Sequence, residues 1–152
     1  MNEPINLENL RRAIFFIADN LSQDDQIRWR IGGASCLYIQ GVDIIPSDIE
    51  IITSREGAYR IAEIFNTFEE KPIELFENNV GRCYLGILRI YEIKIEIQGE
   101  LKLFVDNTLS GDLLQPIRTI NVGNRQIPIC PLEEMCKRYH KYGGNRAQLK
   151  VR

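Results

Sequence analysis

The stretch from residue 27 to residue 52 constrains the fold more than any other part of the chain. An apolar strand runs into a Gly32-Gly33 pair, a short helical run follows, and a second strand then carries Asp48 and Glu50 with one isoleucine between them. Residues i and i+2 of a strand share a face, so the two carboxylates project together while their apolar neighbours point into a core. Because adjacent carboxylates repel each other, such a pair needs a cation or solvent to neutralise it.

Length and composition set the outer bounds. The chain has 152 residues, of which 44% are hydrophobic and 26% charged, so we expect one globular domain over residues 1–152. A formal charge of -2 and a pI near 5.5 argue against a general nucleic-acid or membrane-surface binder. There is no membrane-length apolar run, and MNEPINLENL lacks the basic and apolar regions of a signal peptide. The sequence therefore predicts a protein of the cytoplasm that does not engage a membrane.

The cysteines have no paired metal-ligand spacing and stand among apolar neighbours, which favours reduced, mostly buried thiols over a zinc site. They are Cys36, Cys83, Cys130 and Cys136.

The chain opens with a helix followed by a strand. Apolar residues recur at helical spacing over residues 7–21, and Asn6 is placed to cap this helix. Over residues 27–31 apolar residues alternate with Arg28 and Arg30. This alternation predicts a half-buried strand whose arginines lie on its polar side.

A second amphipathic helix is predicted over residues 58–68, and Lys71-Pro72 is expected to stop it. A short strand is expected over residues 73–76. A strand-helix-strand-helix beginning implies an α/β or α+β domain.

The middle of the chain is rich in predicted strands. Residues 83–90 and 93–98 form a tight β-hairpin, and Glu96 is a lone acid on a strand whose other face is aliphatic. Residues 100–115 have weak periodicity, so we expect mostly loop with one short helix at most. A second hairpin is predicted over residues 117–129.

The C-terminal part begins with Pro131, which suits a first helical position. The predicted helix runs to about residue 142 and ends at Gly143-Gly144. Its polar side is basic, and two interpretations stay open: a solvated face that suits the helix dipole, or a site where Lys137 or Lys141 meets a phosphate.

The order of these motifs resembles the nucleotidyltransferase superfamily, the fold shared by polymerase-beta-like and antibiotic-modifying enzymes. In that family a glycine followed by glycine or serine precedes a strand with two acids one residue apart, and a third acid lies on a later strand. Gly32-Gly33, Asp48, Glu50 and Glu96 match this order. The segment over residues 127–135, IPICPLEEM, leads into a Lys-bearing helix and is similar to AbiEii-type toxins and lincosamide nucleotidyltransferases.

The resemblance implies an α+β fold with a mixed sheet and helices mainly on one face. It also implies that Asp48, Glu50 and Glu96 are catalytic and hold Mg²⁺ or Mn²⁺, because a hard cation binds carboxylates and phosphate oxygens together. We expect their carboxyl groups to lie within about 6 Å of a common point, because shared ions require it.

By the same resemblance, four residues would contact the phosphates of a nucleoside triphosphate, the glycines through close backbone approach. They are Gly32, Gly33, Ser35 and Lys137. Two of the three acids are Glu where Asp is commoner in the family, which places their carboxylates over about 1 Å further from the backbone.

Each motif also has a purely structural interpretation. Gly32-Gly33 is a turn, Asp48 and Glu50 are the solvated face of an edge strand, and Glu96 forms a surface ion pair with Lys94 or with a neighbouring arginine.

Two functions follow. The first is a nucleotidyltransferase that moves NMP from an NTP to an acceptor that the sequence does not identify. The second is a catalytically silent nucleotide-binding regulator or toxin-antitoxin component. A homodimer or a small helical partner protein is compatible with either function.

Overall fold

A computed structural model describes residues 5–151, with side chains placed for residues 5–141. In this part of the chain, helices and strands follow one another in an α+β order. The helical segments are α1 (Leu7–Leu21), α2 (Gly33–Ile39), α3 (Arg55–Ile64), the 3-10 turn η1 (Asn66–Phe68) and α4 (Leu132–Val151). The strands are β1 (Trp29–Gly32), β2 (Ile49–Thr53), β3 (Glu69–Glu77), β4 (Gly81–Ile90), β5 (Ile93–Val105), β6 (Thr108–Leu109), β7 (Arg118–Val122) and β8 (Arg125–Ile129).

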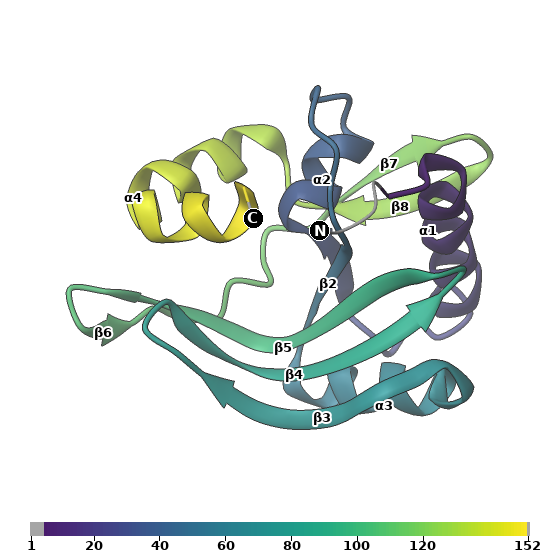
Figure 1. The fold of residues 1–152 in the computed structure, drawn as a ribbon, viewed down its shortest axis with the longest axis horizontal. Coiled ribbons are helices and arrows are strands. Elements are labelled where there is room, and N and C mark those ends of the chain that lie inside the picture. The colour runs from purple at the N-terminus through teal and green to yellow at the C-terminus, as the bar shows by residue number, and fades with distance from the viewer. Residues whose placement is uncertain (1–4, 152) are drawn as a thin grey trace.

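The central sheet is mixed. Its strand order is β1-β2-β5-β4-β3, with β6 paired to the end of β5, and β7-β8 forms a separate hairpin (Figure 1). Strands β2 and β5 are parallel, whereas the other pairs in the sheet are antiparallel. The parallel pair places two strands far apart in sequence side by side at the centre of the sheet.

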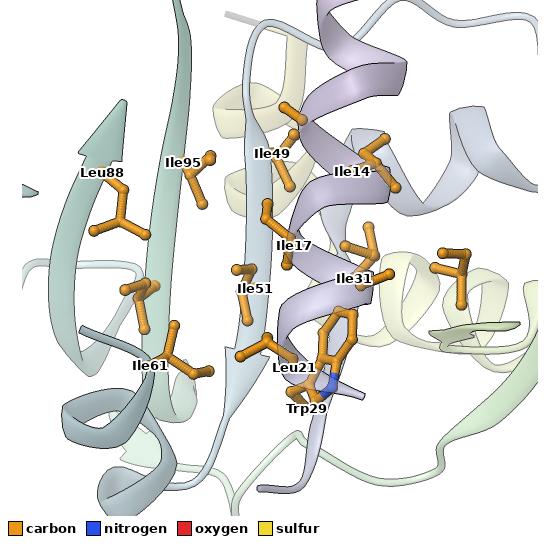
Figure 2. Close-up of a cluster of buried hydrophobic side chains, with 14 of the residues drawn as sticks. Ile14, Ile17, Leu21, Trp29, Ile31, Ile49, Ile51, Ile61, Leu88 and Ile95 are labelled. Atoms are coloured by element: carbon orange, nitrogen blue, oxygen red, sulfur yellow. The ribbon is translucent and has the colours of Figure 1, made fainter. Parts of the chain in front are cut away.

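The first helix begins where the sequence predicts. The Asn6 side chain accepts a hydrogen bond of 3.0 Å from the backbone N–H of Asn9, which caps α1. The apolar stripe of α1 packs into the main core, where it contacts β5 and β8 and where Ile17 joins Ile51 of β2 (Figure 2). Helix α3 covers the same face of the sheet through Ile61. This arrangement confirms the predicted mixed sheet with helices packed mainly on one face.

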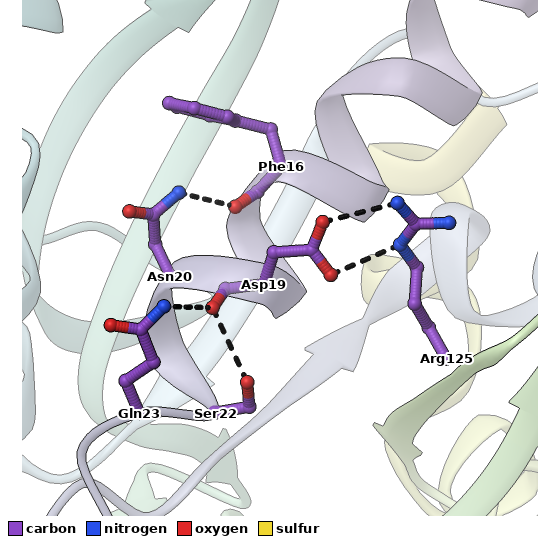
Figure 3. Close-up of polar contacts among 6 residues, drawn as sticks. All are labelled: Phe16, Asp19, Asn20, Ser22, Gln23 and Arg125. Atoms are coloured by element: carbon purple, nitrogen blue, oxygen red, sulfur yellow. Dashed lines mark hydrogen bonds and ion pairs between the residues drawn. The ribbon is translucent and has the colours of Figure 1, made fainter.

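An ion pair joins α1 to the β7-β8 hairpin. The Arg125 guanidinium donates to both carboxylate oxygens of Asp19, at 3.0 and 3.1 Å (Figure 3). The same guanidinium lies 4.3 Å from the ring centroid of Phe15. A bidentate contact and a cation–π contact together fix the hairpin against the helix.

The predicted end of the second amphipathic helix is wrong. Helix α3 ends at Ile64 instead of residue 68, and Lys71-Pro72 lies inside β3 instead of stopping a helix. Strand β3 is at the edge of the sheet, where a missing N–H is tolerated, and its register with β4 shifts around Pro72.

The segment over residues 100–115 was expected to be loop, but β5 continues to Val105 and turns back into β6. The turn uses Asp106 and Asn107 with φ of 51° and 64°. These residue types tolerate the left-handed region, so the hairpin forms without glycine.

Helix α4 passes through Gly143-Gly144 to Val151 instead of ending there. An internal glycine costs about 1 kcal/mol relative to alanine, which weakens a helix without stopping it.

The prediction for Arg30 is also wrong. Its side chain is 3% exposed, and its guanidinium donates to the backbone carbonyls of Leu114 at 2.8 Å and Leu113 at 2.9 Å. The segment that carries these leucines covers the face of β1 that the alternating pattern left open to solvent.

None of the helices in the described part of the chain has the length and apolar character needed to cross a lipid bilayer.

Candidate functional site

A cavity of about 300 Å³ lies on the face of the central sheet opposite the main core. One end is polar and contains Asp48, Glu50, Glu96 and Gln98. Along β5 the lining changes from these polar residues to Leu101 and Leu103, which with Phe76 and Val80 form the apolar end. A volume of this size is at the lower end of the range for small-molecule sites.

The parallel pairing of β2 with β5 brings the acids together. Glu50 and Glu96 are register partners on the two strands, so their side chains leave the sheet on the same face. Asp48 precedes Glu50 by two residues and lines the same cavity. Glu50 is 6% exposed, whereas the Glu96 side chain is 24% exposed. Two predicted acids from distant parts of the sequence are therefore neighbours, and the third shares their cavity.

The two glutamates are linked by an amide. The Gln98 Nε2 group donates to Oε1 of Glu50 and to Oε1 of Glu96, each at 3.1 Å. The Lys94 ammonium lies 3.2 Å from Oε2 of Glu96. Each oxygen of the Glu96 carboxylate thus already has a positively polarised partner, and the ion pair with Lys94 that the structural interpretation proposed is present.

The glycine corner is built for tight packing. A Cβ at Gly32 would stand 2.6 Å from Cγ1 of Ile52, and Gly33 has a φ of +56°. The first position therefore has no room for a side chain, and the second favours glycine. Both glycines are buried, and the corner contributes Ala34 to the wall of the cavity.

Ser35 stabilises this corner from inside. Its hydroxyl donates to the Gly32 carbonyl at 2.7 Å and accepts from the Glu50 N–H at 3.2 Å. The residue is 1% exposed. The structure thus places Ser35 behind the acids, linking the glycine turn to β2, rather than on the cavity wall.

Lys137 lies on an exposed part of α4. Its ammonium is 3.3 Å from Oε1 of Glu134, its side chain is 74% exposed, and it does not line the cavity. The structure does not bring it to the acids, and the solvated-face interpretation agrees with this position.

The thiol of Cys83 reports the electrostatics of the cavity. Burial is the largest cause that raises its pKa, and the nearby charges of Glu96 and Glu50 raise it further, to about 12. The two carboxylates that act on this thiol also line the cavity, and their negative charge favours a cation there.

The donor set agrees with a hard divalent cation, since three carboxylates border one cavity. Within the residues that the structure describes, however, no group of three or more His, Cys, Asp or Glu side chains is arranged to hold a metal ion. The amide of Gln98 and the ammonium of Lys94 lie on the carboxylate oxygens instead. The chemistry of the residues fits a cation, which would have to replace these donors.

Sequence reasoning missed the role of Gln98 and the apolar end of the cavity. Period-2 alternation places Gln98 on the same face of its strand as Glu96, but nothing in the sequence indicates that its amide contacts the acids. The apolar end joins Phe76 of β3 to Leu101 and Leu103 of β5, and no local pattern predicts this pairing across strands.

No family model matches the chain, and no curated protein matches it either. Among solved structures, the chain is similar to the crystal structure of a "putative nucleotidyltransferase" from Thermotoga maritima, with a TM-score of 0.82 and 27% sequence identity. The similarity covers 91% of this chain and 88% of the other. It supports the resemblance to the nucleotidyltransferase superfamily at the level of the superfamily. The chain therefore has a nucleotidyltransferase-like α+β fold.

Proposed function

We propose that this protein is a metal-dependent nucleotidyltransferase that moves NMP from an NTP to an acceptor. The observation that carries the proposal is the register pairing of Glu50 with Glu96 beside Asp48 on one cavity wall. The likeness to a Thermotoga maritima protein named for this activity supports it.

In this proposal Asp48, Glu50 and Glu96 hold Mg²⁺ or Mn²⁺. A bound divalent cation would supply positive charge against the phosphate oxygens and the leaving pyrophosphate. The acceptor oxygen attacks the α-phosphorus, the bond from this phosphorus to pyrophosphate breaks, and the acceptor proton passes to a carboxylate. Glu96 suits the last role because it is the more exposed of the two paired glutamates.

The apolar end of the cavity would receive a ring of the nucleoside or of the acceptor. Phe76 is 46% exposed and lies on this wall, so an aromatic surface is available for a flat group.

The proposal includes a closer relationship of this chain to AbiEii-type toxins or lincosamide nucleotidyltransferases within the superfamily. This relationship rests on residues 127–135 and on the basic helix that follows. A homodimer or a small helical partner would complete the acceptor site, and the cytoplasm would supply NTP and Mg²⁺.

A thermal-shift experiment tests the proposal. NTP with Mg²⁺ should raise the unfolding temperature of the wild type, and Asp48→Ala should abolish the gain because it removes a cation ligand. Asp43→Ala is the matched control, since Asp43 is exposed on the same loop and does not line the cavity. Equal gains in the wild type and in Asp48→Ala would remove the metal assignment.

A second candidate function is a catalytically silent nucleotide-binding regulator or toxin-antitoxin component. The observation that favours it is the Glu96 carboxylate, whose two oxygens already contact Gln98 and Lys94. Pyrophosphate release from NTP distinguishes the two functions. A thermal shift with no pyrophosphate release, in the presence of candidate acceptors, would favour the silent protein.

A further inference from the structure

Gln98 lines the cavity beside the acids. It is 9% exposed and lies on β5 two residues after Glu96, on the same face of the sheet as the register pair Glu50 and Glu96. An amide NH₂ group has two hydrogens, and here one goes to Glu50 and the other to Glu96, each at 3.1 Å. The donor capacity of the Gln98 side chain is therefore used entirely on the two carboxylates.

The chemistry of the neighbours fixes the orientation of this amide. With the amide reversed, its carbonyl oxygen would stand between two carboxylates, where acceptor would face acceptor. In the observed orientation, that carbonyl oxygen has no hydrogen-bond partner among the described side chains and backbone groups, and the residue lines the cavity. It can therefore accept a hydrogen bond from a molecule in the cavity.

We propose that the Gln98 amide holds the carboxylates of Glu50 and Glu96 together until a divalent cation takes over this role, and so sets the cation affinity of the site. The inference rests on the proposed function. Gln98 is in this view a positioning residue, because it acts through the two glutamates.

The physical basis is a competition for the same lone pairs. A neutral amide offsets the repulsion between two carboxylates only in part, since it brings partial charges rather than a full charge. A divalent cation offsets it more fully, but it must first displace the amide hydrogens. Because cation affinity rises with the number of charged ligands, replacing the amide by a carboxylate should strengthen binding.

Two variants test this competition. Gln98→Glu retains the shape and replaces the donor by a fourth carboxylate in the cavity, whereas Gln98→Met removes the donor without adding charge. Without cation, both variants should unfold at a lower temperature than the wild type. Addition of Mn²⁺ should raise their unfolding temperatures by more than that of the wild type. Direct titration with Mn²⁺, followed by the electron paramagnetic resonance of the free ion, should show about tenfold tighter binding for Gln98→Glu.

Gln40→Glu is the matched control. The Gln40 amide is also partly buried, but it donates to the backbone carbonyl of Cys130 at 2.8 Å, away from the cavity. This variant should unfold at a lower temperature with no added response to Mn²⁺. Such a loss is the signature of a merely structural amide.

The outcomes separate the inference from the proposed function. If the wild type binds Mn²⁺ and both Gln98 variants bind it equally well or more weakly, the inference is overturned and the proposed function stands. If the wild type and Gln98→Glu both fail to bind Mn²⁺, the inference fails together with the metal assignment. Should Gln98→Glu not fold, the comparison of Gln98→Met with the wild type decides.

Discussion

The two faces of β2 and β5 differ in nearly every physical property although they belong to the same strands. On one face Ile51 and Ile97 are register partners and both are 0% exposed. On the other face Glu50 and Glu96 are register partners at the wall of a cavity. Strand alternation thus lets a fully packed core hold the acids in place from behind. The apolar residues determine where the carboxylates are, and the carboxylates determine what the site can bind.

The largest expected effect is a difference in the free energy of unfolding between a substitution on the apolar face and one on the acidic face. Ile51→Ala should lower the free energy of unfolding by about 2–5 kcal/mol, because it opens a void in a packed core. Glu50→Gln should change it by no more than about 1 kcal/mol, since relief of repulsion with Glu96 offsets a weakened hydrogen bond. Urea denaturation measures both changes. If Glu50→Gln destabilises the protein as much as Ile51→Ala does, the acidic face is part of the structural core.

The second prediction concerns the covered part of the acidic face, where Arg30 is buried under the segment that carries Leu113 and Leu114. Arg30→Met should lower the free energy of unfolding by about 2–3 kcal/mol, because the buried Leu114 carbonyl loses its charged donor. The Leu113 carbonyl, in contrast, still accepts from Arg138. Arg28→Met is the control, since Arg28 is exposed on the same segment of chain, and should cost less than about 0.5 kcal/mol. Equal losses in a chemical denaturation series would show that Arg30 is not an anchor.

These two arginines also show where sequence reasoning reaches its limit. The alternation over residues 27–31 correctly predicts a strand but assigns both arginines to solvent. The carbonyls that bind Arg30 come from a segment 83 and 84 residues away, which a local pattern cannot contain. Elements set by local chemistry, such as the Asn6 cap and the tight hairpin between β4 and β5, are predicted correctly.

The candidate site likewise has residues that the sequence predicts and contacts that only the fold shows. Period-2 spacing places Asp48 beside Glu50, and the resemblance to a family adds Glu96, whose pairing with Glu50 depends on a parallel crossover. The family resemblance places Ser35 at the phosphates, but in the structure the residue is buried and its hydroxyl bonds to the backbone. Sequence thus identifies the acids, and only the fold shows which polar groups already hold them.

The third prediction compares two neighbouring residues of β3 that point to opposite faces. Phe76 lines the cavity, whereas Leu75 does not, and both side chains are exposed. Phe76→Ala should weaken NTP or acceptor binding by about tenfold, because stacking on a ring contributes roughly 1–1.5 kcal/mol. Leu75→Ala should leave affinity unchanged. Isothermal titration with NTP and Mg²⁺ measures both, and equal affinities would exclude Phe76 from the ligand site.

The smallest expected effect is a change in the alkylation rate of the Cys83 thiol, which tests the negative charge of the cavity. The pKa of Cys83 is raised to about 12 by burial and by the charges of Glu96 and Glu50. Only the thiolate reacts, so alkylation at pH 8 should be slow and should rise about tenfold per pH unit. Glu96→Gln removes one raising cause, so the pKa should fall and the alkylation rate at pH 8 should increase a few fold.

Cys36 is the internal control for this measurement. The pKa of its thiol is also raised, mainly by burial, but neither glutamate is among the causes. Cys136 is exposed, so the experiment uses a Cys136→Ser background to avoid its faster reaction. Peptide mapping by mass spectrometry should then show faster alkylation at Cys83 and no change at Cys36. A parallel increase at both thiols would mean that Glu96→Gln loosens the whole domain, and the negative charge of the cavity would lose its support.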